Sequence, residues 1–131
     1  MEIIKLISPL EVMVSNKKKF ILNMNNYRNA HYQVLNKAKV AYKMAMVKQI
    51  TRLAPMDVVK IKYRLYPKTR RKMDISNILA IHDKFFCDAL VELGGLPDDD
   101  YRHVVGSNYR FGGVDSGNGR VEILIKNLVP S

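Results

Sequence analysis

The chain has 131 residues and a formal net charge of +10, from 22 Lys and Arg against 12 Asp and Glu. This length is enough for one domain with a hydrophobic core, and no run of residues is long and apolar enough for a transmembrane helix. The opening residues lack the pattern of a signal peptide, and Cys87 has no partner for a disulfide or a Cys-based zinc site, so we expect a cytoplasmic protein without membrane contact.

The first part of the chain predicts two strands followed by a long helix. Residues 2–8 and 17–24 have the apolar content of short strands. From Tyr27 to Leu53 the apolar residues recur at the spacing of an amphipathic helix, and Ala54-Pro55 ends it.

Residues 58–67 alternate between apolar and mostly cationic side chains, which is typical of a half-buried strand. We therefore expect one face of this strand to enter the core and the other to be cationic. The apolar set is Val59, Ile61, Tyr63 and Leu65, and the opposite set is Lys60, Lys62, Arg64 and Tyr66.

A second helix is predicted from Ile75 to Leu93. Asp74 or Ser76 is expected to be its N-cap, and Gly94-Gly95 follows its end.

Two further strands are expected at His103–Arg110 and Arg120–Lys126. The order of strands and helices predicts a single α/β domain of the α+β kind over residues 1–131. It should have two layers, with a mixed sheet of about four to five strands packed with two main helices.

The charge is unevenly distributed along the chain. Residues 1–72 hold 17 Lys and Arg against three acids, whereas residues 73–131 hold five against nine. A cationic surface of this strength indicates a polyanionic partner, because neutralising phosphates releases their condensed counterions. We expect nucleic acid as that partner. The alternatives are charge that serves only solubility and, with less support, attachment to a membrane surface.

Seven of the twelve carboxylates nevertheless lie within residues 70–100, directly behind the basic run Arg70-Arg71-Lys72. Mg²⁺ binds through one or two carboxylates together with phosphate oxygens and water, so acids inside a basic surface suit phosphodiester hydrolysis. Each element also has a simpler interpretation, Asp74 as a helix cap and Asp98–Asp100 as a solvated turn. Asp74 and Asp99 meet only if the chain after the helix runs back along it.

The combination within residues 70–100 resembles the RusA family of Holliday junction resolvases, endonucleases often carried by phages and prophages. The family pattern is a basic run, Asp-x-Asp-Asn, a helical Lys followed four residues later by Asp-Ala-Leu, and a closing Asp-Asp. The Asn-rich stretch LNMNNYRNAH is similar to the family's opening, so the resemblance spans nearly the whole chain, although only residues 70–100 are specific. The matching positions are Asp74-Ile75-Ser76-Asn77, Lys84, Asp88-Ala89-Leu90 and Asp98-Asp99.

Two positions depart from the family pattern. Ser76 stands in place of the second Asp, and the stretch between Asn77 and Lys84 is about four residues longer, close to one helical turn. Asp83 follows Ser76 on the same helix face, which makes it a candidate for the missing acid and a further metal ligand. The alternative for Asp83 is a salt bridge on the helix surface.

The resemblance implies a Mg²⁺-dependent, structure-specific endodeoxyribonuclease that hydrolyses phosphodiester bonds at four-way or other branched DNA junctions in recombination and repair, with Mn²⁺ able to replace Mg²⁺. Asp74 and Asp99 are then the catalytic metal ligands, with Asp98 in or near the site, while Lys84 contacts the scissile phosphate and Asp88 is structural. Family members act as homodimers, which suits symmetric cutting of a two-fold branch point. The cations expected to position the DNA backbone are Arg70, Arg71 and Lys72, and on the strand Lys60, Lys62 and Arg64.

The competing hypothesis is a basic DNA-binding protein without catalysis, a resolvase that lost cleavage together with the acid at position 76. A third is a metal nuclease that acts on other DNA branches or on RNA. Mg²⁺-dependent nicking of a synthetic four-way junction distinguishes the enzyme from the binder.

Overall fold

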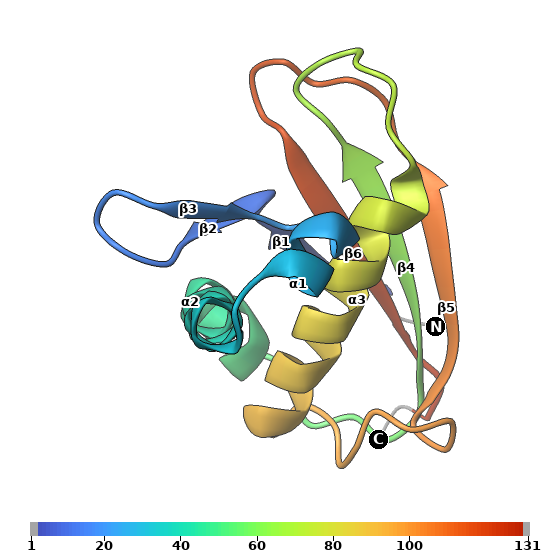
Figure 1. Cartoon of the computed structure of the whole chain (residues 1–131). Helices are drawn as coiled ribbons and strands as arrows, with labels where there is room; N and C mark the ends of the chain where they lie inside the picture. Colours follow the sequence, from blue (N-terminus) through green and yellow to red (C-terminus); the bar gives the residue numbers. More distant parts are fainter. Residues whose placement is uncertain (1–2, 130–131) are drawn as a thin grey trace.

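The computed structural model describes residues 3–129, which form a layer of helices against one face of a mixed β-sheet (Figure 1). The sheet has the strand order β1-β6-β4-β5, and β2 and β3 form a separate hairpin. The predicted α+β class with a mixed sheet is confirmed. Among residues 3–129 no helix combines the length and apolarity needed to cross a membrane. The elements are β1 (Ile3–Ser8), β2 (Glu11–Met13), β3 (Lys19–Ile21), α1 (Met24–Asn29), α2 (Tyr32–Thr51), β4 (Val59–Tyr66), α3 (Ile75–Glu92), β5 (Val104–Phe111) and β6 (Arg120–Asn127).

The β2–β3 hairpin differs from the strand expected at residues 17–24. Only Lys19–Ile21 forms a strand, and it pairs antiparallel with Glu11–Met13 outside the main sheet. Each of these short strands buries a single residue, Val12 or Phe20, between two exposed ones. One apolar side chain on each strand covers the edge of the core but does not supply a buried sheet face.

The helix expected from Tyr27 to Leu53 is in fact two helices, α1 and α2, with a break at Ala30 and His31. Asn23 caps α1, its Oδ1 accepting a backbone N–H at 2.8 Å. His31 caps α2, its Nδ1 accepting from the backbone N–H of Gln33 at 3.3 Å. Because polar side chains cap both N-termini, the chain turns between the helices without a Gly or Pro.

Helix α3 connects β4 to β5, which are neighbouring and parallel. A parallel pair requires a crossover connection, so α3 runs antiparallel to both strands across one face of the sheet. Its N-terminal end therefore lies near the end of β4, and its C-terminal end leads into the start of β5. The 18 residues of α3 separate these two ends by about 27 Å.

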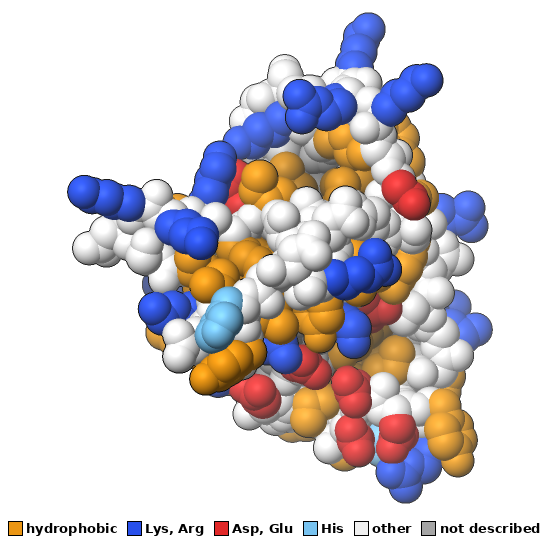
Figure 2. All heavy atoms as spheres, viewed as in Figure 1, with side chains coloured by type: hydrophobic (Ala, Val, Ile, Leu, Met, Phe, Trp, Pro, Cys, Tyr) orange, Lys and Arg blue, Asp and Glu red, His pale blue; other side chains and the backbone are white. Residues whose placement is uncertain are grey.

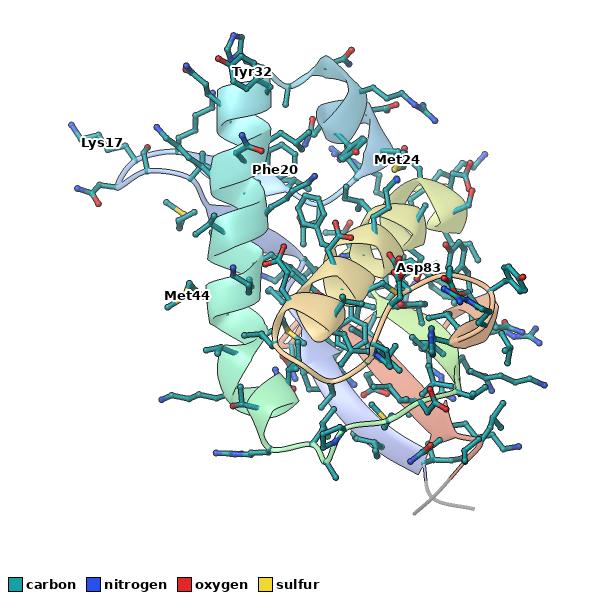
Figure 3. All side chains as sticks on the ribbon, turned by 90° about the horizontal axis from the view of Figure 1, so that it is seen from below. Lys17, Phe20, Met24, Tyr32, Met44 and Asp83 are labelled. Carbon is teal, nitrogen blue, oxygen red and sulfur yellow. The ribbon has the colours of Figure 1, made fainter. Side chains whose placement is uncertain are left out.

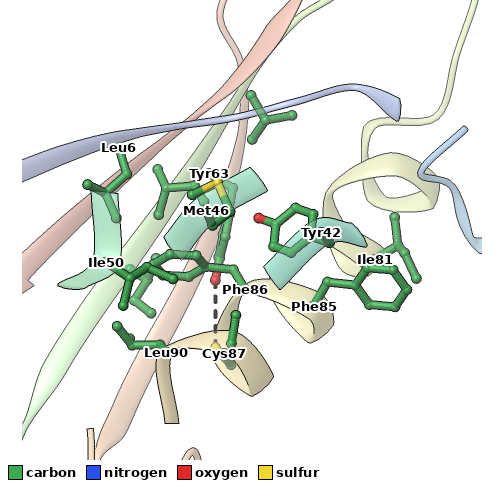
Figure 4. Close-up of a cluster of buried hydrophobic side chains, with 14 of the residues drawn as sticks. Leu6, Tyr42, Met46, Ile50, Tyr63, Ile81, Phe85, Phe86, Cys87 and Leu90 are labelled. Carbon is green, nitrogen blue, oxygen red and sulfur yellow. Dashed lines mark hydrogen bonds between the residues drawn. The ribbon is translucent and has the colours of Figure 1, made fainter. Parts of the chain in front are cut away.

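The hydrophobic core lies between the sheet and the two long helices (Figure 4). Helix α2 contributes a stripe of buried side chains four residues apart, and β4 contributes every second residue, as its alternation predicts. Lys60 and Lys62 are exposed on the opposite face of the sheet. The buried sets are Ala38, Tyr42, Met46 and Ile50 of α2, and Val59, Ile61, Tyr63 and Leu65 of β4.

One polar network crosses this core. The Ser8 hydroxyl lies 2.7 Å from both the Tyr42 hydroxyl and Nδ1 of His82, and all three side chains are buried. Nε2 of His82 has no hydrogen-bond partner among residues 3–129. Burial disfavours the charged imidazole and lowers the pKa of His82 to about 3. His82 is therefore a neutral core side chain at neutral pH.

The His82 environment predicts a specific sensitivity to acid. Since the pKa of His82 is about 3 in the folded state and 6.5 in the unfolded chain, only the unfolded chain takes up this proton between those values. The stability that His82 contributes is complete above pH 6.5 and is lost as the pH falls toward 3. Between pH 7 and pH 5 the free energy of unfolding of the wild type should fall by about 2 kcal/mol more than that of His82→Phe. Urea denaturation at both pH values measures this difference, and parallel losses in the two proteins would contradict it.

Candidate functional site

Asp74 is the N-cap of α3, one of the two caps that the sequence predicts. Its Oδ1 accepts from the backbone N–H of Ser76 at 3.0 Å and from the Ser76 hydroxyl at 2.8 Å. These bonds, the hydroxyl first and the backbone N–H second, hold the pKa of Asp74 below its usual range. Ser76 therefore donates to Asp74 at the position where the family pattern places a second acid.

A cleft of about 500 Å³ opens between α1 and the first turns of α3. Asp74, Ser76 and Asn77 line it from the α3 side, and Asn25 and Arg28 line it from α1. The last two belong to the Asn-rich stretch, but no sequence pattern assigns them a role. Their proximity to Asp74 arises from the packing of α1 against α3, and the only sequence signal for it is the similarity of that stretch to the opening of the RusA family.

Lys84 lies ten residues beyond Asp74, about 15 Å along the helix axis. Its Nζ is 5.6 Å from the centroid of the Tyr27 ring, a cation–π contact that orients the amine toward α1. The side chain is exposed and has no ion-pair partner among residues 3–129. Its charge is therefore free to meet a phosphate.

Asp83 lies between α3 and the strands β4 and β5 (Figure 3). Its Oδ1 accepts from the Tyr63 hydroxyl and its Oδ2 from the Tyr109 hydroxyl, each at 2.8 Å, and the Cys87 thiol is 3.4 Å from Oδ1. None of the ion pairs in residues 3–129 involves Asp83. The salt bridge considered for it is therefore not formed, because two phenols from the sheet take both oxygens of the half-buried carboxylate.

The tyrosines that hold Asp83 are themselves perturbed. Burial raises the pKa of Tyr63 and of Tyr109 well above the usual range of a phenol, and the neighbouring Asp83 carboxylate raises both further. Both phenols therefore stay protonated and remain hydrogen-bond donors to the carboxylate.

The Asp98–Asp100 segment lies in the loop that follows α3. Asp100 forms a two-pronged ion pair with the guanidinium of Arg102, with the shortest contact at 2.6 Å. The backbone N–H of Asp99 donates to Asp98 at 2.7 Å. Burial, the hydrogen bond with Asp98 and the negative charge of Asp88, in that order, raise the pKa of Asp99. Asp99 therefore lies beside the C-terminal half of α3, within reach of the Asp88 charge.

The structure separates Asp74 from Asp99. Asp74 caps the N-terminal end of α3, whereas Asp99 responds to the charge of Asp88, 14 residues and about 21 Å further along the helix. The Asp98–Asp100 segment precedes β5, so it stays at the end of the sheet where β5 begins, one helix length from the first turn of α3. A single metal ion shared by Asp74 and Asp99 does not fit this fold.

The charges of Asp83 and Asp99 both act on the Cys87 thiol. Burial raises the pKa of the Cys87 thiol, and the charges of both Asp83 and Asp99 raise it further. Asp83 hydrogen-bonds this thiol, whereas Asp99 is exposed and does not, and the three side chains do not form a metal-binding group. Carboxylates such as Asp83 and Asp99 suit Mg²⁺ in kind, since Mg²⁺ takes one or two carboxylates and completes its coordination with water and phosphate oxygens.

Further protein ligands are not available at this place. Across residues 3–129, no group of three or more His, Cys, Asp or Glu side chains is arranged to hold a metal ion. A metal between Asp83 and Asp99 would depend on oxygens from outside the chain, such as those of a phosphodiester.

The cations fall into two sets on different sides of the molecule. Arg70, Arg71 and Lys72 are exposed in the loop before α3, next to Asp74. Figure 2 shows Lys and Arg side chains gathered over this end, while most of the acidic side chains lie toward the opposite end. Lys60 and Lys62 lie on the sheet face turned away from α3. The expected DNA-binding cations thus do not form one continuous surface with the acids.

A scan against protein-family models matched none of them, and a search of curated proteins found no match either. The RusA resemblance of residues 70–100 therefore remains an expectation from the sequence.

The bonds around Asp83 predict a measurable contribution to stability. Tyr109→Phe removes one donor from a half-buried carboxylate and should lower the free energy of unfolding by about 1–2 kcal/mol. Tyr101→Phe is the matched control, because Tyr101 is 82% exposed and its hydroxyl has no hydrogen bond to any of residues 3–129; it should change nothing. Urea denaturation of the two variants measures both values. Equal stabilities would show that the Tyr109 hydroxyl does not support Asp83.

Proposed function

We propose that the chain is a Mg²⁺-dependent endonuclease that cleaves branched DNA, such as four-way junctions, during recombination or repair. Mn²⁺ serves as an alternative ion, and a cytoplasmic homodimer is the proposed working form. The observation that supports this most is Asp83, a half-buried carboxylate oriented by two phenols and without an ion pair to any of residues 3–129, in a chain of net charge +10. Carboxylates repel phosphate unless a cation lies between them, so a metal ion explains their presence in a DNA-binding protein.

In this proposal Asp83 and Asp99 hold the metal, in place of the pair Asp74 and Asp99 that the resemblance implies. When bound, the ion activates a water molecule and neutralises charge that develops on the phosphate. Tyr63 and Tyr109 fix the orientation of the Asp83 carboxylate through one hydrogen bond to each oxygen. Such fixed carboxylates need little rearrangement when a ligand arrives.

Asp99 is suited to receive a cation for an electrostatic reason. Its pKa is raised by burial and by neighbouring acids, including Asp88, so the ionised carboxylate is less favoured than in a free aspartate. A divalent cation beside it relieves this repulsion and favours the ionised form. Asp98, which accepts a hydrogen bond from the Asp99 backbone N–H, adds to the negative potential around Asp99.

Asp74 and Lys84 have separate roles in the proposal. Asp74 keeps the first turn of α3 in place, next to the exposed cations Arg70 and Arg71, which bind the DNA backbone without reading its sequence. Lys84 meets a phosphate on the α1 side of the helix. Arg28, which shares the cleft with Asp74, extends this cationic end, and the neutral amide of Asn25 lies in the same cleft.

The second candidate is a DNA-binding protein without catalysis. Two observations favour it: Ser76 hydrogen-bonds Asp74 at the position of the family's second Asp, and residues 3–129 contain no metal-binding group of three ligands. The two candidates share the DNA-binding surface and differ in whether Asp83 and Asp99 act on a metal.

Charge-removing variants separate the two candidates. Asp83→Asn and Asp99→Asn should each lower Mg²⁺-dependent nicking of a synthetic four-way junction by about a hundredfold or more, because each removes a ligand of the ion. Asp74→Asn should retain nicking within about tenfold, since Asn and Asp cap helices about equally well. Metal-free binding of the same junction and the melting temperature are the controls for DNA affinity and folding.

Other outcomes of this assay decide against the proposal. A wild-type protein that binds the junction but does not nick it with Mg²⁺ or Mn²⁺ is the non-catalytic binder. If nicking survives both Asp83→Asn and Asp99→Asn but is lost in Asp74→Asn, the metal site is at the N-terminal end of α3.

A further inference from the structure

The sheet face that points away from the helices, here called the outer sheet face, is strongly cationic. The strand registers place Lys126 and Gly106 beside Lys60, and Glu122 and Arg110 beside Arg64, so these side chains share that face. No other element of residues 3–129 packs over it. Seven cations and one carboxylate extend from its strands, namely Lys5, Lys60, Lys62, Arg64, Arg110, Arg120 and Lys126 with Glu122.

The single carboxylate of this face is already neutralised. Glu122 is only 7% exposed, and the guanidinium of Arg120 contacts it at 3.0 Å. Arg64 and Lys5 lie at 3.8 and 4.0 Å from its oxygens. Four cations remain without an ion pair to any of residues 3–129, namely Lys60, Lys62, Arg110 and Lys126.

Three of these four cations, all except Arg110, border a groove of about 630 Å³. Lys60, Lys62 and Lys126 rise from its sides, and Ile3 and Val105, which are 64% and 45% exposed, contribute apolar surface between them. A shallow groove with cations along its sides fits a chain of phosphates, because each amine reaches a separate charge.

Three kinds of occupant are distinguished by charge and by aromatic content. A second copy of the chain through a two-fold contact would place like-charged faces against each other, which opposes association. A single strand of nucleic acid is bound through bases stacked on exposed aromatic rings. The one tyrosine of this face, Tyr66, is covered by Arg120 at 4.1 Å on its ring and packs against Gly112, where a Cβ would come within 2.5 Å of it. The phosphate backbone of a duplex remains as the occupant that matches the face.

We infer that the outer sheet face is a second DNA-binding surface, which holds the backbone of one duplex arm while the α3 side of the molecule meets another arm. The inference rests on the proposed function for DNA as the polyanion, but not on cleavage. Because the two surfaces lie on opposite sides of one sheet, and duplex DNA stays straight over far longer distances than this domain, one linear duplex does not reach both. The diverging arms of a branched molecule do.

Matched triple variants test the surface by metal-free fluorescence anisotropy. Lys60→Gln, Lys62→Gln and Lys126→Gln together should weaken four-way junction binding by about tenfold or more and reduce the slope of log affinity against log salt by about two to three. The control triple is Lys37→Gln, Lys48→Gln and Arg52→Gln, which removes the same charge from exposed cations of α2 and its C-terminal end. It should leave most of the affinity and the slope in place. The outer-face triple should also lower junction affinity to about that of a linear duplex of equal length.

A cross-link locates the DNA directly. Cys87 is buried, so a photoreactive thiol reagent labels an introduced cysteine in preference to it. Asn108→Cys on the outer sheet face should cross-link to junction DNA, whereas Val40→Cys, an exposed site on α2, should not.

The remaining outcomes overturn the inference in recognisable ways. Equal losses in the two triple variants, or no cross-link from position 108, would show that DNA does not use this face. If the outer-face triple variant stabilises or dissociates a dimer in sedimentation, the face is a contact between two copies of the chain. If polyglutamate competes as effectively as duplex DNA, the face binds acidic proteins. If the wild type never nicks DNA but the outer-face triple variant loses junction binding, the DNA-binding surface is supported and only the proposed nuclease activity is contradicted.

Discussion

The parallel pairing of β4 with β5 is the constraint on which the rest of the structure depends. Parallel neighbours need a crossover, and α3 is that crossover. Its direction fixes Asp74 at the end of β4 and the acidic loop at the start of β5, about one helix length apart. It also assigns the two sides of the sheet, because the side that α3 covers becomes the core and the other side keeps its lysines in water.

The placement of Asp83 follows from the same crossover. A half-buried carboxylate without a cation is costly unless its oxygens receive hydrogen bonds, and here β4 and β5 each supply one phenol. Tyr63 and Tyr109 pair in register across the two strands, so the parallel alignment that requires α3 also positions both donors under it. The arrangement fixes the orientation of the carboxylate, and Asp83 forms no ion pair with any of residues 3–129. In the proposed function, this oriented carboxylate receives a cation.

The sequence predicts features that depend on local pattern and misses those that depend on packing. The alternation of β4 and the cap and extent of α3 repeat within a few residues, so they were predictable, and the structure has them. The break at Ala30 and His31 was not predicted, because a histidine cap is rare and neither Gly nor Pro marks it. The tyrosine donors of Asp83 lie 20 and 26 residues away, a separation that no helical or strand periodicity encodes. Likewise, the sequence shows that Ser76 and Asp83 share a helix face, but it does not show their partners, which are Asp74 for Ser76 and two tyrosines for Asp83.

The two sides of the sheet differ in how their charges are distributed, and each side carries its own group of cations. On the helix side, cations gather in the basic loop at Arg70 and acids in the loop at Asp99, at opposite ends of α3. On the outer side, cations predominate, and the only carboxylate is occupied by arginine. Lysines such as Lys60 and Lys62, unpaired beside one another, repel each other in the free protein, and a bound polyanion relieves that repulsion. If the protein recognises a branch point as proposed, two separated cationic surfaces would bind two arms together more tightly than either binds one.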